Sequence, residues 1–193
     1  MSDKILKKNS IEQITFFVKK NYKAFILLLI TLFTLLFIFL ILKNLEEKKN
    51  IKISEQYTRA SILIKQKKIE EGKSILKAII NENHKFYSPL ALYLIIDKNI
   101  ESDEAKIIIF FDKILKNKSI DKENLNLIKI KKSIYLINLD NEKLILETLN
   151  PIITSDSIWR NIAINIMSGY FISKGQKIKA KEYNQLLNNE TIR

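Results

Sequence analysis

AFILLLITLFTLLFIFLIL, from Ala24 to Leu42, is a run of nineteen residues without a charge, an amide, a glycine or a proline. Thr31 and Thr34 supply its only polar side-chain atoms. At about 1.5 Å per residue, a helix of this length covers roughly 28 Å, which matches a hydrocarbon core about 30 Å thick. The stretch therefore predicts a transmembrane helix, and the rest of the chain is placed by it.

A cleaved signal peptide is the main alternative for this stretch. Its apolar region would have about 7–15 residues and would end in small residues at a cleavage site. Here the apolar run is longer and is followed by the residues KNLEE at positions 43–47, with no pair of small residues. Sixteen of the nineteen residues are Leu, Ile or Phe, which favours insertion by about 5–10 kcal/mol. We therefore expect an uncleaved anchor.

Lysines flank the anchor unequally, and this bias predicts its orientation. Lysines in short flanking segments tend to stay in the cytoplasm. The flank after the anchor mixes its lysines with Glu46 and Glu47. We expect the N-terminus in the cytoplasm and residues 43–193 on the other side, in a periplasm if the cell has one. The lysines before the anchor are Lys4, Lys7, Lys8, Lys19, Lys20 and Lys23, and those after it are Lys43, Lys48, Lys49 and Lys52.

The net charge of +12 is not read as a sign of nucleic-acid binding. The cations are 30 Lys and only 3 Arg, and Arg is the residue that contacts phosphates and base edges with two hydrogen bonds. An abundance of Lys, Ile and Asn is typical of an A/T-rich genome. The absence of cysteine excludes a disulfide framework and thiolate metal sites.

Apolar residues after the anchor recur at helical spacing, with few valines and no hairpin dipeptide of the Asn-Gly type. The fold class predicted is therefore all-α. We expect a cytoplasmic tail over residues 1–23, with a short amphipathic helix that begins at a capping box at Ser10. The transmembrane helix covers residues 24–42, a helical stalk covers 43–54, and a helical domain covers 55–193.

The domain is expected to hold four helix pairs, close to 34 residues per pair. Ser88 and Pro89 predict a helix start, and Pro151 a helix end. Small residues would let the helices of a pair approach closely, and Ala60 is matched with Ala91, and Gly72 with Ala105, on this basis. A helical bundle without repeats is the alternative. The expected helices are 57–67, 69–81, 88–98, 104–117, 122–139, 142–150, 158–174 and 176–188.

The last stretch, GYFISKGQKIKAKEYNQLLNN from Gly169 to Asn189, resembles a tetratricopeptide repeat. It has an aromatic residue at the end of its first helix, Gly175 at the turn and Ala180 facing back. The lysine-rich tail, single anchor, charged stalk and the segments YSPLALYL (87–94) and IWRNIAINIMSGYF (158–171) are similar to the ancillary SecYEG translocon subunit family, the YfgM-like proteins.

This resemblance implies a bacterial inner-membrane protein with a periplasmic tetratricopeptide-like domain, an α-solenoid. It also implies a non-enzymatic role, in contact with translocon subunits and periplasmic chaperones that handle exported proteins. A scaffold for cell-envelope assembly or division, and a cytoplasm-facing domain that binds acidic partners, are the alternatives.

No catalytic residue, cofactor or metal site is predicted. The three glycines are too scattered for a phosphate loop, and the lone His84 is expected to be a solvated loop side chain. An array of helix pairs would instead bind proteins on the concave face lined by the first helices. The candidates there are Tyr57, Ser61, Lys65, Leu92, Ile95, Asn165 and Ile172, with burial in the core as the alternative for Leu92, Ile95 and Ile172.

Overall fold

The computed structural model describes residue 16 and residues 19–188, which form parts of two compact units, residues 1–52 and 53–193. The described residues form helices and contain no strand, which confirms the all-α class. The predicted amphipathic helix at Ser10 lies almost wholly outside the described residues. The helices are α2 (Tyr22–Lys65), α3 (Ile69–Glu82), α4 (Tyr87–Asp97), α5 (Glu104–Leu115), α6 (Lys122–Asn138), α7 (Glu142–Ile153), α8 (Arg160–Ser173) and α9 (Lys177–Asn188).

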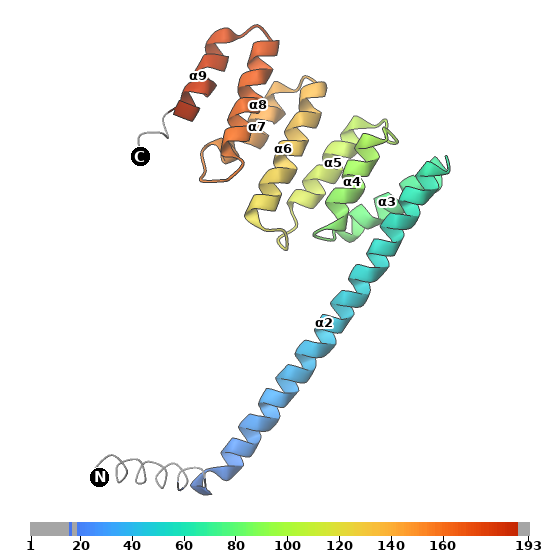
Figure 1. The fold of residues 1–193 in the computed structure, drawn as a ribbon, viewed down its shortest axis with the longest axis vertical. Helices are drawn as coiled ribbons and strands as arrows, with labels where there is room; N and C mark the ends of the chain where they lie inside the picture. The colour runs from blue at the N-terminus through green and yellow to red at the C-terminus, as the bar shows by residue number, and fades with distance from the viewer. Residues whose placement is uncertain (1–15, 17–18, 189–193) are drawn as a thin grey trace, which may run out of the picture. The chain divides into compact units, whose positions relative to one another are not determined.

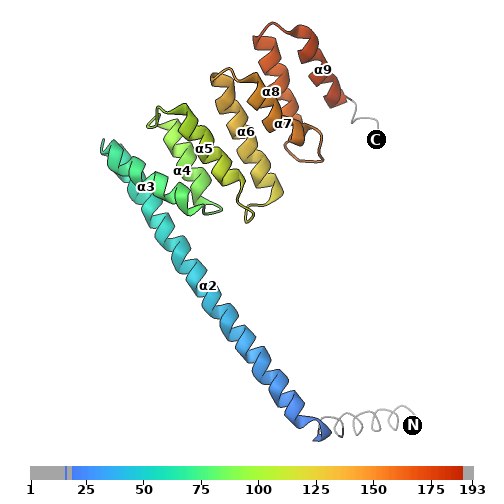
Figure 2. The same cartoon turned by 180° about the vertical axis from the view of Figure 1, so that it is seen from behind.

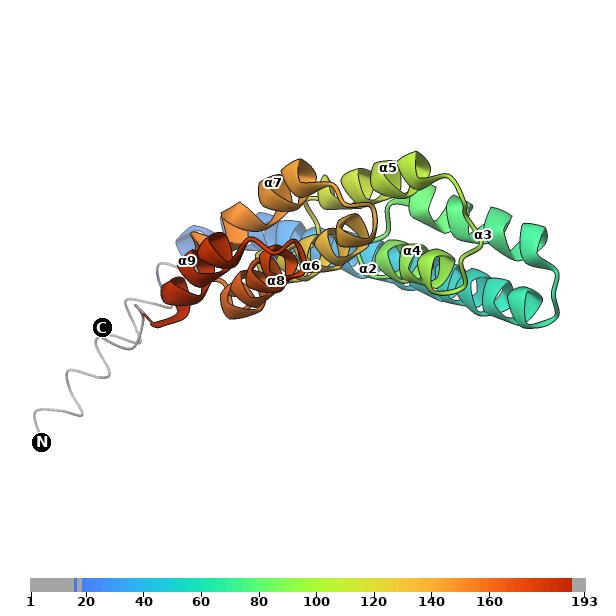
Figure 3. The same ribbon diagram turned by 90° about the horizontal axis from the view of Figure 1, so that it is seen from above.

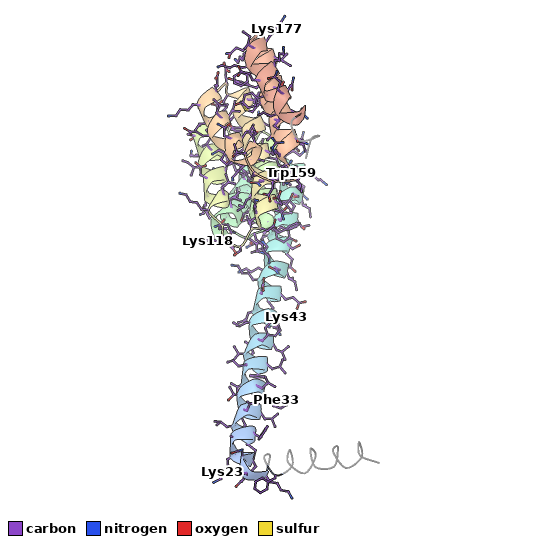
Figure 4. The ribbon with its side chains drawn as sticks, turned by 90° about the vertical axis from the view of Figure 1, so that its left-hand side faces the viewer. Lys23, Phe33, Lys43, Lys118, Trp159 and Lys177 are labelled. Carbon is purple, nitrogen blue, oxygen red and sulfur yellow. The ribbon has the colours of Figure 1, made fainter. Side chains whose placement is uncertain are left out.

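Helix α2 contains the apolar stretch, and every residue of that stretch is exposed. Among the described helices it is the one long and apolar enough to cross a membrane. Its side chains project from the ribbon on all sides between Lys23 and Lys43 (Figure 4). The Thr31 and Thr34 hydroxyls each donate to the carbonyl four residues earlier at 2.8 Å, so the helix satisfies its own polar groups.

Helices α3 to α9 follow one another in sequence order along the second unit (Figures 1 and 2). Each packs against the next, and α6 also packs against α8. Figure 3 shows α3, α5 and α7 in one layer and α4, α6 and α8 in another. Three of the second helices, α3, α5 and α7, therefore lie in one layer, and the first helices α4, α6 and α8 lie in the other (Figure 3).

The first helix of every pair ends in the same turn. One residue has positive φ, its N–H bonds to the carbonyl three residues earlier, and the next N–H bonds to the carbonyl five residues earlier, with distances of 2.9–3.3 Å. This is the Schellman arrangement, which satisfies carbonyls that the helix end would leave unpaired. At these four turns the residues with positive φ are Lys67 (64°), Asn99 (48°), Asp140 (54°) and Gly175 (71°).

These turns establish the true register of the pairs. The residue seven positions before each turn is buried, and so is the fourth residue of each following helix. The matching of Ala60 with Ala91 and of Gly72 with Ala105 is therefore wrong by one and two positions, and Ala105 is exposed. The equivalent first-helix residues are Ala60, Leu92, Ser133 and Ser168, and the equivalent second-helix residues are Gly72, Ile107, Ile145 and Ala180.

Two predicted helix ends also differ from the structure. Helix α4 begins before Ser88, whose buried hydroxyl donates to the Ile79 carbonyl at 2.8 Å and so joins α4 to α3 instead of capping it. Helix α7 continues through Pro151 to Ile153. Pro151 is exposed and lies in the last turn of the helix, where its missing N–H removes one backbone hydrogen bond and the helix ends two residues later.

The connection between α4 and α5 is longer than the other three turns within pairs. Residues 98–103 separate α4 from α5, whereas three residues suffice at 66–68, 139–141 and 174–176. The longer loop contains the buried Glu101, whose carboxylate lies 2.6 Å from the Lys77 ammonium and 3.4 Å from that of Lys73. Both lysines belong to α3, so this ion pair joins the first helix pair to the second.

The three glycines give a test of this geometry, since alanine should have a different effect at each. Gly169→Ala should raise the free energy of unfolding by up to about 1 kcal/mol, because this helical site is exposed and open. Gly72→Ala should lower it by about 1–3 kcal/mol, because the added Cβ would lie 2.7 Å from Ile64 Cγ1 and 3.0 Å from the Ala60 carbonyl oxygen. Gly175→Ala should lower it by about 1 kcal/mol through its positive φ.

Thermal unfolding of the full chain in detergent, followed by circular dichroism, measures these changes. A stability gain in Gly72→Ala equal to that in Gly169→Ala would contradict the close approach of α2 and α3.

Glu101 should make stability depend on pH. The hydrogen bond from Lys77 lowers the pKa of Glu101 from 4.5 to about 2, and Lys73 adds to this effect. The folded carboxylate therefore stabilises the unit fully above pH 4.5, and this contribution is lost as the pH falls toward 2. Glu101→Gln should cost about 1–3 kcal/mol at pH 7 and almost nothing at pH 2.

Unfolding measured at both pH values tests this prediction. Asp97→Asn is the control, because the Asp97–Lys98 pair is exposed and should contribute little. An equal cost of Glu101→Gln at both pH values would show that the ion pair does not stabilise the unit.

Candidate functional site

A cavity of about 470 Å³ lies between α4 and α6, in the layer of first helices. This volume is within the range of about 300–1,000 Å³ that is typical of ligand pockets. Its walls are mostly apolar side chains, with polar groups at one end. The lining residues are Lys85, Phe86, Pro89, Leu90, Tyr93, Ser119, Ile120, Asp121, Asn124, Leu127 and Ile128.

The cavity exists because its two helices begin at different places. Counted back from the equivalent buried positions, α6 begins eleven residues before Ser133, at Lys122, whereas α4 begins only five residues before Leu92, at Tyr87. The first turns of α6 therefore lack an equal length of helix beside them. The loop before α4 occupies part of this space with Phe86, whose side chain is 59% exposed.

His84 shapes this loop, and the expectation that it is merely solvated is wrong. Its Nδ1 accepts hydrogen bonds from the backbone N–H groups of Phe86 (3.2 Å) and Tyr87 (3.1 Å). These are donors that the start of α4 would otherwise leave unpaired. His84 therefore performs the capping that was assigned to Ser88. Because Nδ1 is the acceptor, it carries no proton in this arrangement.

Aromatic rings connect the cavity edge to α2. The Phe86 and Tyr87 rings lie edge to face with centroids 5.2 Å apart, and Tyr87 is 5.9 Å from Tyr57. Such contacts stabilise beyond the area that they bury, by about 0.5–1.5 kcal/mol each. The rings hold Phe86 at the edge of the cavity even though its own side chain is largely exposed.

Asp121, the carboxylate in the cavity lining, caps α6, and Lys131 lies outside the lining beside Tyr93. Asp121 accepts from the backbone N–H of Asn124 at 3.0 Å and from its amide at 2.6 Å, and these bonds lower the pKa of Asp121. The Lys131 ammonium lies 4.9 Å from the centroid of the Tyr93 ring and makes no ion pair with a described residue. Burial raises the pKa of Tyr93 to about 12, which keeps its hydroxyl protonated as a donor.

The residues predicted as a binding surface are not brought together in this cavity. Leu92 and Ile95 are fully buried in the core, so their assignment to a contact face is corrected. Both lie on the side of α4 that faces its neighbouring helices. Ser61 is half-buried and donates to the Tyr57 carbonyl at 3.0 Å. The exposed candidates are Lys65 on α2 and Asn165 and Ile172 on α8, and Tyr57 is half-buried in the ring contacts described above.

The cavity residues were missed because no local motif marks them. Leu90 and Tyr93 share the helical spacing of the core residues in α4, and Leu127 does so in α6. The available signal was the difference in length between the two helices, since the sequence after Asp121 remains helical in pattern for longer than that after Phe86. That difference becomes a cavity only when the two helices are placed side by side.

Comparison with models of protein families, with curated proteins and with solved structures finds no match to this chain.

Proposed function

We propose that this chain is a single-pass membrane protein whose helical unit binds segments of other proteins in the cavity between α4 and α6. The cavity carries the proposal, because it combines an apolar floor with hydrogen-bonding groups at its edge. Ser119 and Asn124 offer polar atoms to a peptide backbone, and Phe86 and Leu127 offer apolar contact. The role is binding and not catalysis.

The four helix pairs support a tetratricopeptide-like architecture for this unit. Each pair has a residue in the left-handed conformation at the same position of its turn. The first helices α4, α6 and α8 of successive pairs lie in one layer (Figure 3). Contacts between adjacent pairs join residues about one period apart, such as the Asn117 amide and the Asn83 carbonyl at 2.6 Å. Such arrays commonly bind extended peptides along their first helices.

The membrane setting is supported by the exposed surface of α2 and by the flanking lysines. An exposed stretch of nineteen residues, seventeen of them apolar, would be unfavourable in water, whereas a bilayer would cover it. The lysine bias favours a cytoplasmic N-terminus and a helical unit on the outer face of a bacterial inner membrane. The resemblance in the sequence adds the narrower proposal of an ancillary factor at the Sec translocon, working with periplasmic chaperones.

A reporter fused to the C-terminus tests the orientation. Alkaline phosphatase, which is active only outside the cytoplasm, should be active in this fusion, and a fluorescent protein that folds only in the cytoplasm should be dark. The flanking lysines give the physical reason. The opposite result would place the helical unit in the cytoplasm and exclude the export setting.

A photo-crosslinking amino acid in place of Phe86 tests the binding site in intact cells. It should capture proteins, and the proposal at the translocon expects translocon subunits or chaperones among them. Ser119→Trp should block capture, because Ser119 is exposed and lines the cavity. Ser74→Trp on α3 is the matched control, since Ser74 is exposed and is not part of the cavity.

The same crosslinker at Ile178, which is 79% exposed on α9, measures unspecific capture. Equal capture from both positions, or capture that Ser119→Trp leaves unchanged, would rule out the cavity as the binding site. Capture of division proteins alone would exclude the translocon.

A further inference from the structure

The charged residues around the cavity indicate the kind of ligand more specifically than the volume of the cavity does. Lys85 lines the cavity, and Lys131 lies over the face of Tyr93, which also lines it. Both lysine side chains are exposed, so the attraction that either offers to a negative group depends on a close contact at the cavity mouth and not on burial.

Asp121, the carboxylate in the cavity lining, stays charged but lies ten residues before Lys131, about 15 Å along the axis of α6, and so does not neutralise the Lys131 ammonium. Asp121 caps α6 through Asn124. Glu123 accepts from the Ser157 hydroxyl at 2.6 Å and from the Ile158 backbone N–H at 3.2 Å, which joins α6 to the start of the fourth pair. Lys131 has no such partner among the described residues.

The Tyr93 hydroxyl is a second donor at the same place. No described residue accepts a hydrogen bond from it, and the ring below it forms part of the apolar wall. A ligand that fills the space against this ring brings its next polar group close to both the hydroxyl and the Lys131 ammonium. The cavity therefore fits a ligand that has an apolar group and a negatively charged group next to each other.

We propose, on the basis of the peptide-binding function above, that the cavity selects a polypeptide segment in which a large apolar side chain adjoins a carboxylate. The apolar side chain enters between Leu90 and Leu127, and the carboxylate binds Lys131 and the Tyr93 hydroxyl. A protein segment fits better than a lipid, because Ser119 and Asn124 place polar groups beside the apolar floor where a peptide backbone would run.

Selection from a displayed library of random short peptides tests this inference on the full chain in lipid nanodiscs. The enriched peptides should carry Phe, Tyr, Leu or Ile next to Asp or Glu. Ser119→Trp should remove the enrichment and Ser74→Trp should leave it unchanged. Circular dichroism verifies folding, and Leu127→Trp is a second way to fill the cavity if Ser119→Trp does not fold.

Charge variants then test the recognition of the carboxylate. Lys131→Glu should weaken the binding of an enriched peptide by about tenfold or more, because it replaces attraction by repulsion. Tyr93→Phe should weaken it by a smaller factor through the loss of one donor. Lys181→Glu on α9 is the matched control for overall charge, since Lys181 is equally exposed and lies outside the cavity.

The outcomes separate this inference from the proposed function. Apolar peptides without acidic residues, bound equally well by Lys131→Glu, would overturn the carboxylate selection and leave peptide binding intact. A library without any enrichment that depends on Ser119 would overturn both. Dodecanoate binding that Ser119→Trp abolishes, without peptide binding, would show that the ligand is an amphiphilic lipid.

Discussion

The helical unit depends on the left-handed residue that reverses the chain after the first helix of each pair. Its N–H and the next one pair with carbonyls of the last helical turn, and three residues then suffice to connect the two helices in three of the four pairs. This brings the two helices into contact close to the turn, where Gly72 lies against the Ala60 carbonyl and the Ser168 hydroxyl donates to that of Ala180. Burial of the apolar faces follows from this close approach.

The second helix pair departs from this pattern in two ways, which produce the Glu101 ion pair and the cavity. The longer connection after α4 carries Glu101 back to the lysines of α3, which secures the first two pairs to each other. The late start of α4 leaves the first turns of α6 without a helical neighbour, which opens the cavity. The first turn of α6 is held by polar contacts instead, such as the hydrogen bond that Glu123 accepts from the Ser157 hydroxyl at 2.6 Å. Stability and the candidate site thus arise from different parts of the same irregular second pair.

Patterns within single helices were predictable from the sequence, and relations between helices were not. The apolar run and the helical spacing predicted α2 and the positions of the other helices to within a few residues. Among the four turns, only the one at Gly175 has the residue type that most readily adopts a left-handed conformation. Lys67, Asn99 and Asp140 adopt this conformation too, but their residue types predict it less strongly. The register was therefore misjudged, and of the two readings given for Leu92 and Ile95, contact face or core, the structure shows the core. The cavity depends on the starting points of two helices that a third helix separates in the sequence, which no local pattern encodes.

The net positive charge is divided equally between residues 1–52 and the helical unit. Residues 1–52 hold ten lysines and four carboxylates, so they account for half of the net charge of +12. The helical unit carries the other half, and several of its carboxylates serve as caps or ion pairs, as Asp121 and Glu101 show.

A cavity of this size on its own would hold a short segment weakly, because ordering a flexible peptide opposes binding. Tethering to a membrane raises the local concentration of partners that share that membrane, by the same arithmetic that governs linked binding sites. If the unit binds peptides as proposed, the anchor would make weak binding in the cavity sufficient and would favour partners within or close to the same bilayer.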